Sequence, residues 1–127
     1  MEIKYIEQQK MLIFKITEEI DEFKAKDIRR KADYEIERYM PKRVIFDFSR
    51  VSFMDSSGIG MIIGRYKQAA MLGGKTEMIN LNPSVRKIFE MSGVLRLIPE
   101  VILDDEIQID DKGEICYGKW NENRIYK

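Results

Sequence analysis

Met54-Asp55-Ser56-Ser57-Gly58-Ile59-Gly60 joins an apolar segment to an amphipathic one, and this junction decides how the rest of the chain is interpreted. The preceding residues, 43–49, are rich in β-branched and aromatic side chains and nearly continuous in hydrophobicity, which is typical of a central strand covered on both faces. From residue 59 to residue 70, apolar side chains recur at spacings of three and four, which predicts a helix. Three side chains at the junction can cap that helix: Asp55, Ser56 and Ser57. Two hydroxyl groups are therefore expected at an accessible helix start.

The N-terminal third supplies two strands and a helix. Alternating apolar segments at residues 3–7 and 11–17 lie on either side of Gln8-Gln9-Lys10, which predicts a hairpin. A long charged segment follows, in which one apolar stripe runs from Ala25 to Tyr39, so we expect a helix that Pro41 ends. Charges of both signs alternate on the opposite side of this helix, which favours a solvated surface over a nucleic-acid interface.

The second half repeats the order strand, helix, strand. Residues 76–81 predict a strand, and Asn82 as N-cap, Pro83 in the first turn and Gly93 past the end mark a further helix. Residues 94–98 are expected to form a last short core strand. Strands that alternate with helices through short links pair in parallel by right-handed crossovers. The predicted fold class is therefore α/β, a single domain with a mixed sheet of parallel core strands and helices packed against it.

The C-terminal residues are open to two interpretations. Alternating segments within residues 106–117 surround Asp110-Asp111-Lys112-Gly113, which favours a hairpin, whereas residues 103–109 also fit a short acidic helix. The polar end, residues 119–127, is expected to fray. We accordingly divide the chain into a core of residues 1–100 and a C-terminal extension of residues 101–127.

Composition limits the kinds of partner and cellular location. Lysine plus arginine and aspartate plus glutamate number 22 each, so no overall field attracts nucleic acid or anionic lipid. The single Cys116 has no second cysteine for an internal disulfide. No apolar run approaches the roughly 20 residues of a membrane span or resembles a signal peptide. We therefore expect a cytoplasmic protein without a membrane or direct nucleic-acid partner.

The residue inventory argues against enzyme chemistry. The chain contains no histidine, so it has no Ser-His-Asp or Cys-His nucleophile and no imidazole-based metal site. The acidic pairs Asp104-Asp105 and Asp110-Asp111 lack the ligand spacing of a calcium loop. We therefore expect no catalysis, no metal and no cofactor.

The glycines after the junction offer one alternative. Gly58-x-Gly60-x-x-x-Gly64, with Glu77 downstream, is similar to a dinucleotide-binding loop, but its spacing is one residue too long. Close approach of the helix to its neighbours and relief of crowding at the turn explain the glycines as well. Nucleotide or small-ligand binding by this loop stays open as a secondary hypothesis.

Three ordered motifs carry a resemblance to a known family. The run from Val51 to Gln68 closely resembles the signature of the bacterial anti-sigma factor antagonists, the STAS domain family, and especially its sporulation branch. Thr17-Glu18-Glu19-Ile20-Asp21 is similar to the family's Thr-Gly-Glu-Leu-Asp, and Phe89-Glu90-Met91-Ser92-Gly93-Val94 is similar to its Phe-x-x-Ser-Gly-Leu. The resemblance covers roughly residues 1–100, and motifs in matching order are more specific than any one of them.

The resemblance implies a protein switch. Unmodified members of the family bind an anti-sigma factor that is also a serine kinase, and so release the sigma factor. The kinase phosphorylates the serine that follows the aspartate, and a PP2C-type phosphatase removes the phosphate. Here that serine is Ser56, with Ser57 as second choice. The implied partner surface comprises Asp21, Asp55, Ser56, Ser57, Gly58 and Ile59, on a chain that is a monomer when free.

The chain also departs from the family pattern. Glu18 stands where the family has glycine, and Glu22-Phe23-Lys24 replaces a small or polar run after Asp21, which leaves loop shape and partner choice open. Two alternatives to the switch remain: a STAS scaffold that is never phosphorylated, and a small-ligand or nucleotide-binding STAS module.

Overall fold

The parallel centre of the sheet consists of three buried strands. The computed structural model describes residues 1–103, 108–109 and 115–116. β2 (Met11–Lys15), β3 (Arg43–Asp47) and β4 (Lys75–Ile79) run parallel, and β1 (Glu2–Ile6) joins β2 antiparallel at the edge. The order in this four-stranded sheet is β1-β2-β3-β4. The mixed sheet and the N-terminal hairpin confirm the sequence prediction.

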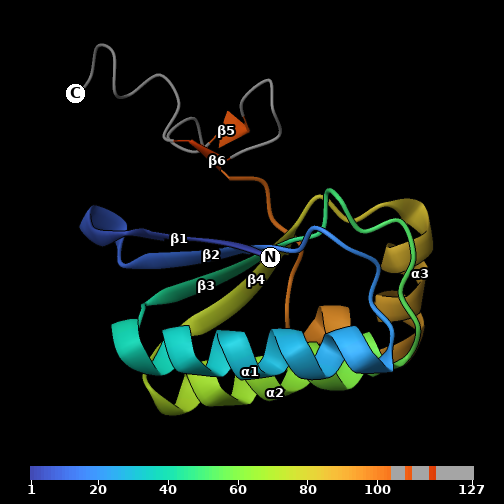
Figure 1. Cartoon of the computed structure of the whole chain (residues 1–127), viewed down its shortest axis with the longest axis horizontal. Coiled ribbons are helices and arrows are strands. Elements are labelled where there is room, and N and C mark those ends of the chain that lie inside the picture. The colour runs from blue at the N-terminus through green and yellow to red at the C-terminus, as the bar shows by residue number, and fades with distance from the viewer. Residues whose placement is uncertain (104–107, 110–114, 117–127) are drawn as a thin grey trace.

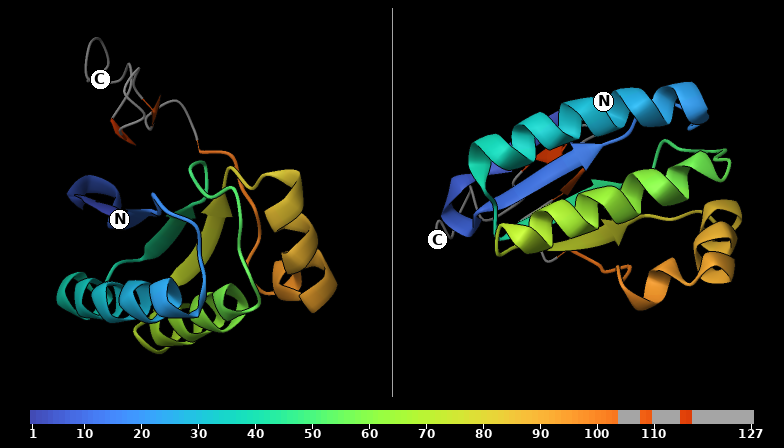
Figure 2. Two further views of the ribbon diagram at one scale, coloured as in Figure 1. Left: turned by 45° about the vertical axis from the view of Figure 1, so that its right-hand side comes forward. Right: turned by 90° about the horizontal axis from the view of Figure 1, so that it is seen from below.

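Two long helices cover one face of this sheet. α1 (Glu22–Tyr39) and α2 (Ser57–Met71) lie side by side beneath it (Figure 1; Figure 2). Alternate strand residues face them, including Phe14 and Phe46, whose rings stack 5.1 Å apart. α3 (Pro83–Ser92) packs at one end of the sheet, where Phe89 meets Phe48 edge to face. The apolar stripes read from the sequence are thus the faces that build the core.

The opposite face of the sheet has its own small core. Ile13, Ile45 and Ile79 occupy it, and the chain beyond β4 returns over it, with Val101 and Leu103 packed on the cluster. Both faces of the central strands are therefore covered, as the continuous hydrophobicity of residues 43–49 predicted.

The predicted strand at residues 94–98 is wrong. Val94–Arg96 is a 3₁₀ turn, η2, that follows directly on the left-handed Gly93. Val94 and Ile98 are both buried, and the amide of Ile98 donates to the carbonyl of Val94, so their spacing of four is that of a helical turn. Glu100, a little further along, forms the isolated parallel bridge to Met78 of β4.

A short hairpin follows the core. β5 (Gln108–Ile109) pairs antiparallel with β6 (Ile115–Cys116), in agreement with the favoured hairpin rather than a helix across residues 108–109. The predicted turn at residues 110–113 and the predicted fraying at 119–127 lie outside the described residues. Within the described ranges, no helix combines the length and apolar character needed to cross a bilayer.

Candidate functional site

The turn into α2 leaves one serine hydroxyl uncommitted. Ser56 is the N-cap residue of α2, but its side chain makes no capping hydrogen bond and the residue is exposed. Asp55 caps instead, since its Oδ1 accepts from the amide of Ser57 at 2.8 Å. Asp55 is half-buried, which fits this structural role. Of the three residues expected to be able to cap, the aspartate caps and Ser56 stays available for other chemistry.

Ser57 and Ile59 are less accessible than Ser56. Ser57 is half-buried and lines a groove of about 220 Å³ between the first turns of α1 and α2, which Met61 also lines. Ile59 is partly buried and packs against the core. Only part of each of these two predicted contact residues therefore lies at the surface.

Gly58 lies at a close approach to the Met54 side chain. A Cβ on Gly58 would overlap the side chain of buried Met54, with the Met54 Cγ only 2.6 Å away. Gly60 and Gly64 have open space at the same position, so crowding explains Gly58 and not the other two. All three lie within α2 rather than in a loop before it, which removes the geometric basis of a dinucleotide loop.

A backbone bridge brings two predicted segments together. Ile20 and Met54 form an isolated parallel bridge, in which the amide of Ile20 donates to the carbonyl of Phe53 and the amide of Asp55 donates to the carbonyl of Ile20, each at 3.0 Å. The chain segment that contains Asp21 therefore lies beside the segment that contains Asp55. The sequence motifs containing Asp21 and Ser56 lie at one end of the molecule, where α1 and α2 both begin (Figure 1).

Asp21 has a structural role that the sequence analysis missed. It is the N-cap of α1, and its Oδ1 accepts from the amide of Lys24 at 2.8 Å. The signal was present, because an aspartate directly before an amphipathic segment is a common helix start. Asp21 is nevertheless exposed, so the cap residue remains accessible at the surface.

Acidic side chains gather at the start of α1. Glu18, Glu19, Asp21 and Glu22 are all exposed. Lys24 forms an ion pair with Glu18, and this hydrogen bond lowers the pKa of the Glu18 carboxyl and raises the pKa of the Lys24 ammonium. One of the nearby cations is thus already paired within the chain.

Side-chain amides hold the loop before Ser56. Asn82 caps α3 as predicted, with its Oδ1 accepting from the amide of Val85, and its Nδ2 also donates to the carbonyl of Val51 at 2.6 Å. Buried Asp47 accepts from the amide of Ser49 and from Nδ2 of Asn80. These supports were not foreseen, because nothing in the sequence indicates which loop an exposed amide contacts.

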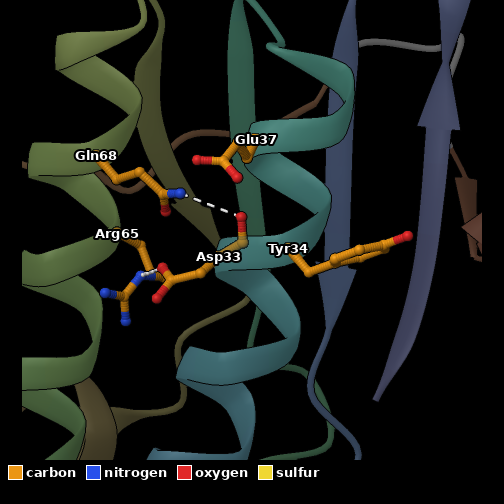
Figure 3. A pocket seen from close by; sticks show the side chains of 5 residues that line it. All are labelled: Asp33, Tyr34, Glu37, Arg65 and Gln68. Carbon is orange, nitrogen blue, oxygen red and sulfur yellow. Dashed lines mark hydrogen bonds and ion pairs between the residues drawn. The ribbon is translucent and has the colours of Figure 1, made fainter.

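A second polar feature lies between the middle turns of the two helices. A pocket of about 460 Å³ is lined by five side chains (Figure 3), Asp33, Tyr34, Glu37, Arg65 and Gln68. Arg65 is buried, and its Nε lies 2.7 Å from Oδ1 of Asp33. Burial lowers the pKa of Arg65, and the Asp33 charge opposes that shift. This pair joins α1 to α2 but lies outside the predicted site.

No metal site emerges from the described residues. In residues 1–103 and the two short strands beyond, no group of three or more acidic or cysteine side chains is placed to hold an ion.

Comparison with known proteins gives consistent matches. Residues 2–108 match the STAS domain. The anti-sigma F factor antagonist of Paenibacillus polymyxa is 31% identical over 107 residues, covering 84% of this chain and 90% of the relative. The solved structure of the anti-sigma factor antagonist SpoIIAA in its unphosphorylated form has a TM-score of 0.69 at 29% identity and covers 80% of this chain and 87% of its own. A structure of Bacillus SpoIIAA in the phosphorylated form has a TM-score of 0.62 at 28% identity, with 80% and 90% covered.

Proposed function

This chain belongs to the STAS domain family, and on that premise we propose that it is a phosphorylation-controlled switch that acts through Ser56. Its role is that of an anti-sigma factor antagonist. In the unphosphorylated state it binds an anti-sigma factor that is also a serine kinase, so that the sigma factor is released. Phosphorylation of Ser56 ends this binding, and a PP2C-type phosphatase restores it. The free protein is a cytoplasmic monomer without enzymatic activity of its own.

The observation that carries this proposal is the uncommitted, exposed hydroxyl of Ser56. The Asp55 side chain accepts from the amide of Ser57 and the Ser56 side chain makes no capping bond, so a kinase can modify Ser56 without removing a capping hydrogen bond. Ser57 is the weaker candidate because its side chain lies partly inside the groove between the helices. The bridge between Ile20 and Met54 brings the segment of Asp21 next to that of Asp55, which supports including Asp21 in the proposed partner surface.

The helix start tolerates a phosphate. The dipole of α2 favours an anion at its N-terminus by about 0.3 to 1 kcal/mol. A phosphoserine at position 56 brings about −1.5 to −2 charge next to Asp55 and near the exposed acids around Asp21. The modification therefore leaves the fold intact and acts on the partner, through repulsion and lost complementarity at a desolvated interface.

Intact-mass measurement with site mapping tests the proposal. The protein is incubated with ATP and, in turn, each purified anti-sigma kinase of its source organism, alongside Ser56→Ala and Ser57→Ala. One phosphate on the wild type and on Ser57→Ala, but none on Ser56→Ala, is the expected result. Stable binding without phosphate on any of the three proteins would instead favour the scaffold that is never phosphorylated.

A further inference from the structure

Two phenylalanines are exposed in a chain that buries the others. Of the six phenylalanines, Phe14, Phe46, Phe48 and Phe89 are fully buried in the core. Phe23 is 78% exposed and Phe53 is 52% exposed. An aromatic ring left in water gains nothing for the fold, and aromatic residues are enriched where proteins bind one another.

Both exposed rings belong to the segments that the Ile20–Met54 bridge joins. Phe53 directly precedes Met54, and its carbonyl accepts the hydrogen bond from the amide of Ile20 at 3.0 Å. Phe23 is the second residue of α1, two positions after the N-cap Asp21. The two segments meet at the end of the molecule where α2 also begins, as Figures 1 and 2 show. Phe23 and Phe53 therefore lie within three residues of the backbone bridge that leads into Ser56 and α2.

The charge around these rings indicates the chemistry of a partner. Four exposed acids lie in the segment that leads into α1, Glu18, Glu19, Asp21 and Glu22. Lys24 is engaged with Glu18, and Ser52 donates to Glu19, so the loop and the segment before α1 are also tied by side chains. A complementary surface has apolar pockets for the rings and lysine or arginine side chains around them.

We propose that Phe23 and Phe53 are the apolar anchors of the anti-sigma factor interface and that, with the acids around them, they determine which anti-sigma factor the chain binds. This inference rests on the proposed function, and it names the residues that supply most of the energy of binding to the anti-sigma factor. The partner is an anti-sigma factor whose docking surface presents apolar pockets bordered by basic side chains. Ser56 lies beside the anchors and controls whether that docking occurs.

Alanine substitution of each ring tests the inference. Affinity for each purified anti-sigma kinase of the source organism is measured by calorimetry, without ATP hydrolysis, for Phe23→Ala and Phe53→Ala. Each is expected to weaken binding by about tenfold or more, the size typical of an aromatic hot spot. Tyr34→Ala is the matched control, since Tyr34 is an aromatic residue of α1 that is 66% exposed and lies about three turns further along. Met91→Ala, at an exposed apolar residue of α3, is the second control.

The outcomes separate this inference from the switch. The anchor proposal would be overturned if Phe23→Ala and Phe53→Ala bound the anti-sigma kinase within twofold of the wild-type affinity. It would also be overturned if Tyr34→Ala lost as much affinity as they do, even if Ser56 is phosphorylated. A selective loss in the two phenylalanine variants supports the anchors even if no phosphate is found on Ser56, in which case only the switch fails. Circular dichroism melting of each variant checks that it is folded, and Phe53→Leu and Phe23→Leu, which keep apolar bulk, are expected to recover part of the affinity.

Discussion

Asp33 of α1 and Arg65 of α2 form the ion pair that links the two helices, with Oδ1 and Nε 2.7 Å apart. The pair is asymmetric, because the Arg65 side chain is 8% exposed and that of Asp33 is 43% exposed. Gln68 adds a hydrogen bond to the backbone carbonyl of Asp33 at 3.1 Å (Figure 3). This polar contact joins the middle turns of α1 and α2, whose apolar residues also pack together in the core.

Removing Asp33 leaves a buried guanidinium without its counter-charge. We expect Asp33→Ala to lower the free energy of unfolding by about 1 to 2 kcal/mol, less than for a fully buried pair because Asp33 is partly solvated. Asp27→Ala is the matched control on the same helix, where the partners Arg30 and Lys31 are surface residues and a smaller loss is expected. Urea unfolding measures both. Equal losses would mean that burial of Arg65 does not matter.

Alanine substitutions at two glycines of α2 are expected to change stability in opposite directions. Gly58→Ala places a methyl group against buried Met54 and is expected to destabilise the protein by about 1 to 3 kcal/mol. Gly60→Ala meets no neighbour and is expected to stabilise by about 0.5 to 1 kcal/mol, since alanine is the better helix former. Thermal melts of the two variants test the sign. Destabilisation by Gly60→Ala would show that its surroundings are tighter than the structure has them.

Much of this architecture followed from the sequence because periodicity reports which face is buried. The stripe from Ala25 to Tyr39 and the apolar run at residues 43–49 became α1 and β3, since burial on one face or on both leaves a distinct pattern. The prediction failed at Val94 and Ile98 because two buried residues four positions apart, with apolar neighbours, fit either a buried strand or a single helical turn. Contacts between distant segments could not be predicted, since no periodicity records that Asn82 bonds to Val51 or that Asp33 meets Arg65.

The acid dependence of stability has a defined contribution from Glu100. Its carboxylate accepts from Arg86 and from the amide of Leu81, and these hydrogen bonds, chiefly that from Arg86, lower its pKa below the usual 4.5. Because the folded-state pKa is lower than that of the unfolded chain, the stabilisation is present above about pH 4.5 and is lost as pH falls through the folded-state pKa. Glu100→Gln should be less stable than wild type at pH 7, and the gap should close at lower pH. A gap that is constant with pH would contradict this.

Two substitutions of Asp21 separate its role as a helix cap from the role of its charge in binding. Asparagine caps helices about as well as aspartate, so Asp21→Asn should retain stability, whereas Asp21→Ala should lose about 1 kcal/mol. Because Asp21 is exposed and belongs to the proposed partner surface, we expect both variants to bind the anti-sigma factor more weakly than the wild type. Melting temperature and affinity, measured on the same two variants, distinguish the roles. Full affinity in Asp21→Asn would leave Asp21 as a helix cap alone.

Charge at position 56 should affect binding and not folding. The Ser56 side chain makes no capping bond and lies at the positive end of the α2 dipole, so Ser56→Asp is expected to change the free energy of unfolding by no more than about 1 kcal/mol, in the stabilising direction. The same variant is expected to bind the anti-sigma factor at least about tenfold more weakly, because the new charge lies next to Asp55 and meets a surface matched to a neutral serine. Ser56→Asn has similar size without the charge and should keep more of the affinity. Urea unfolding and calorimetry on the pair provide the comparison. A Ser56→Asp protein that binds as tightly as the wild type, or one that unfolds, would show that charge at this helix start does not act in the way proposed.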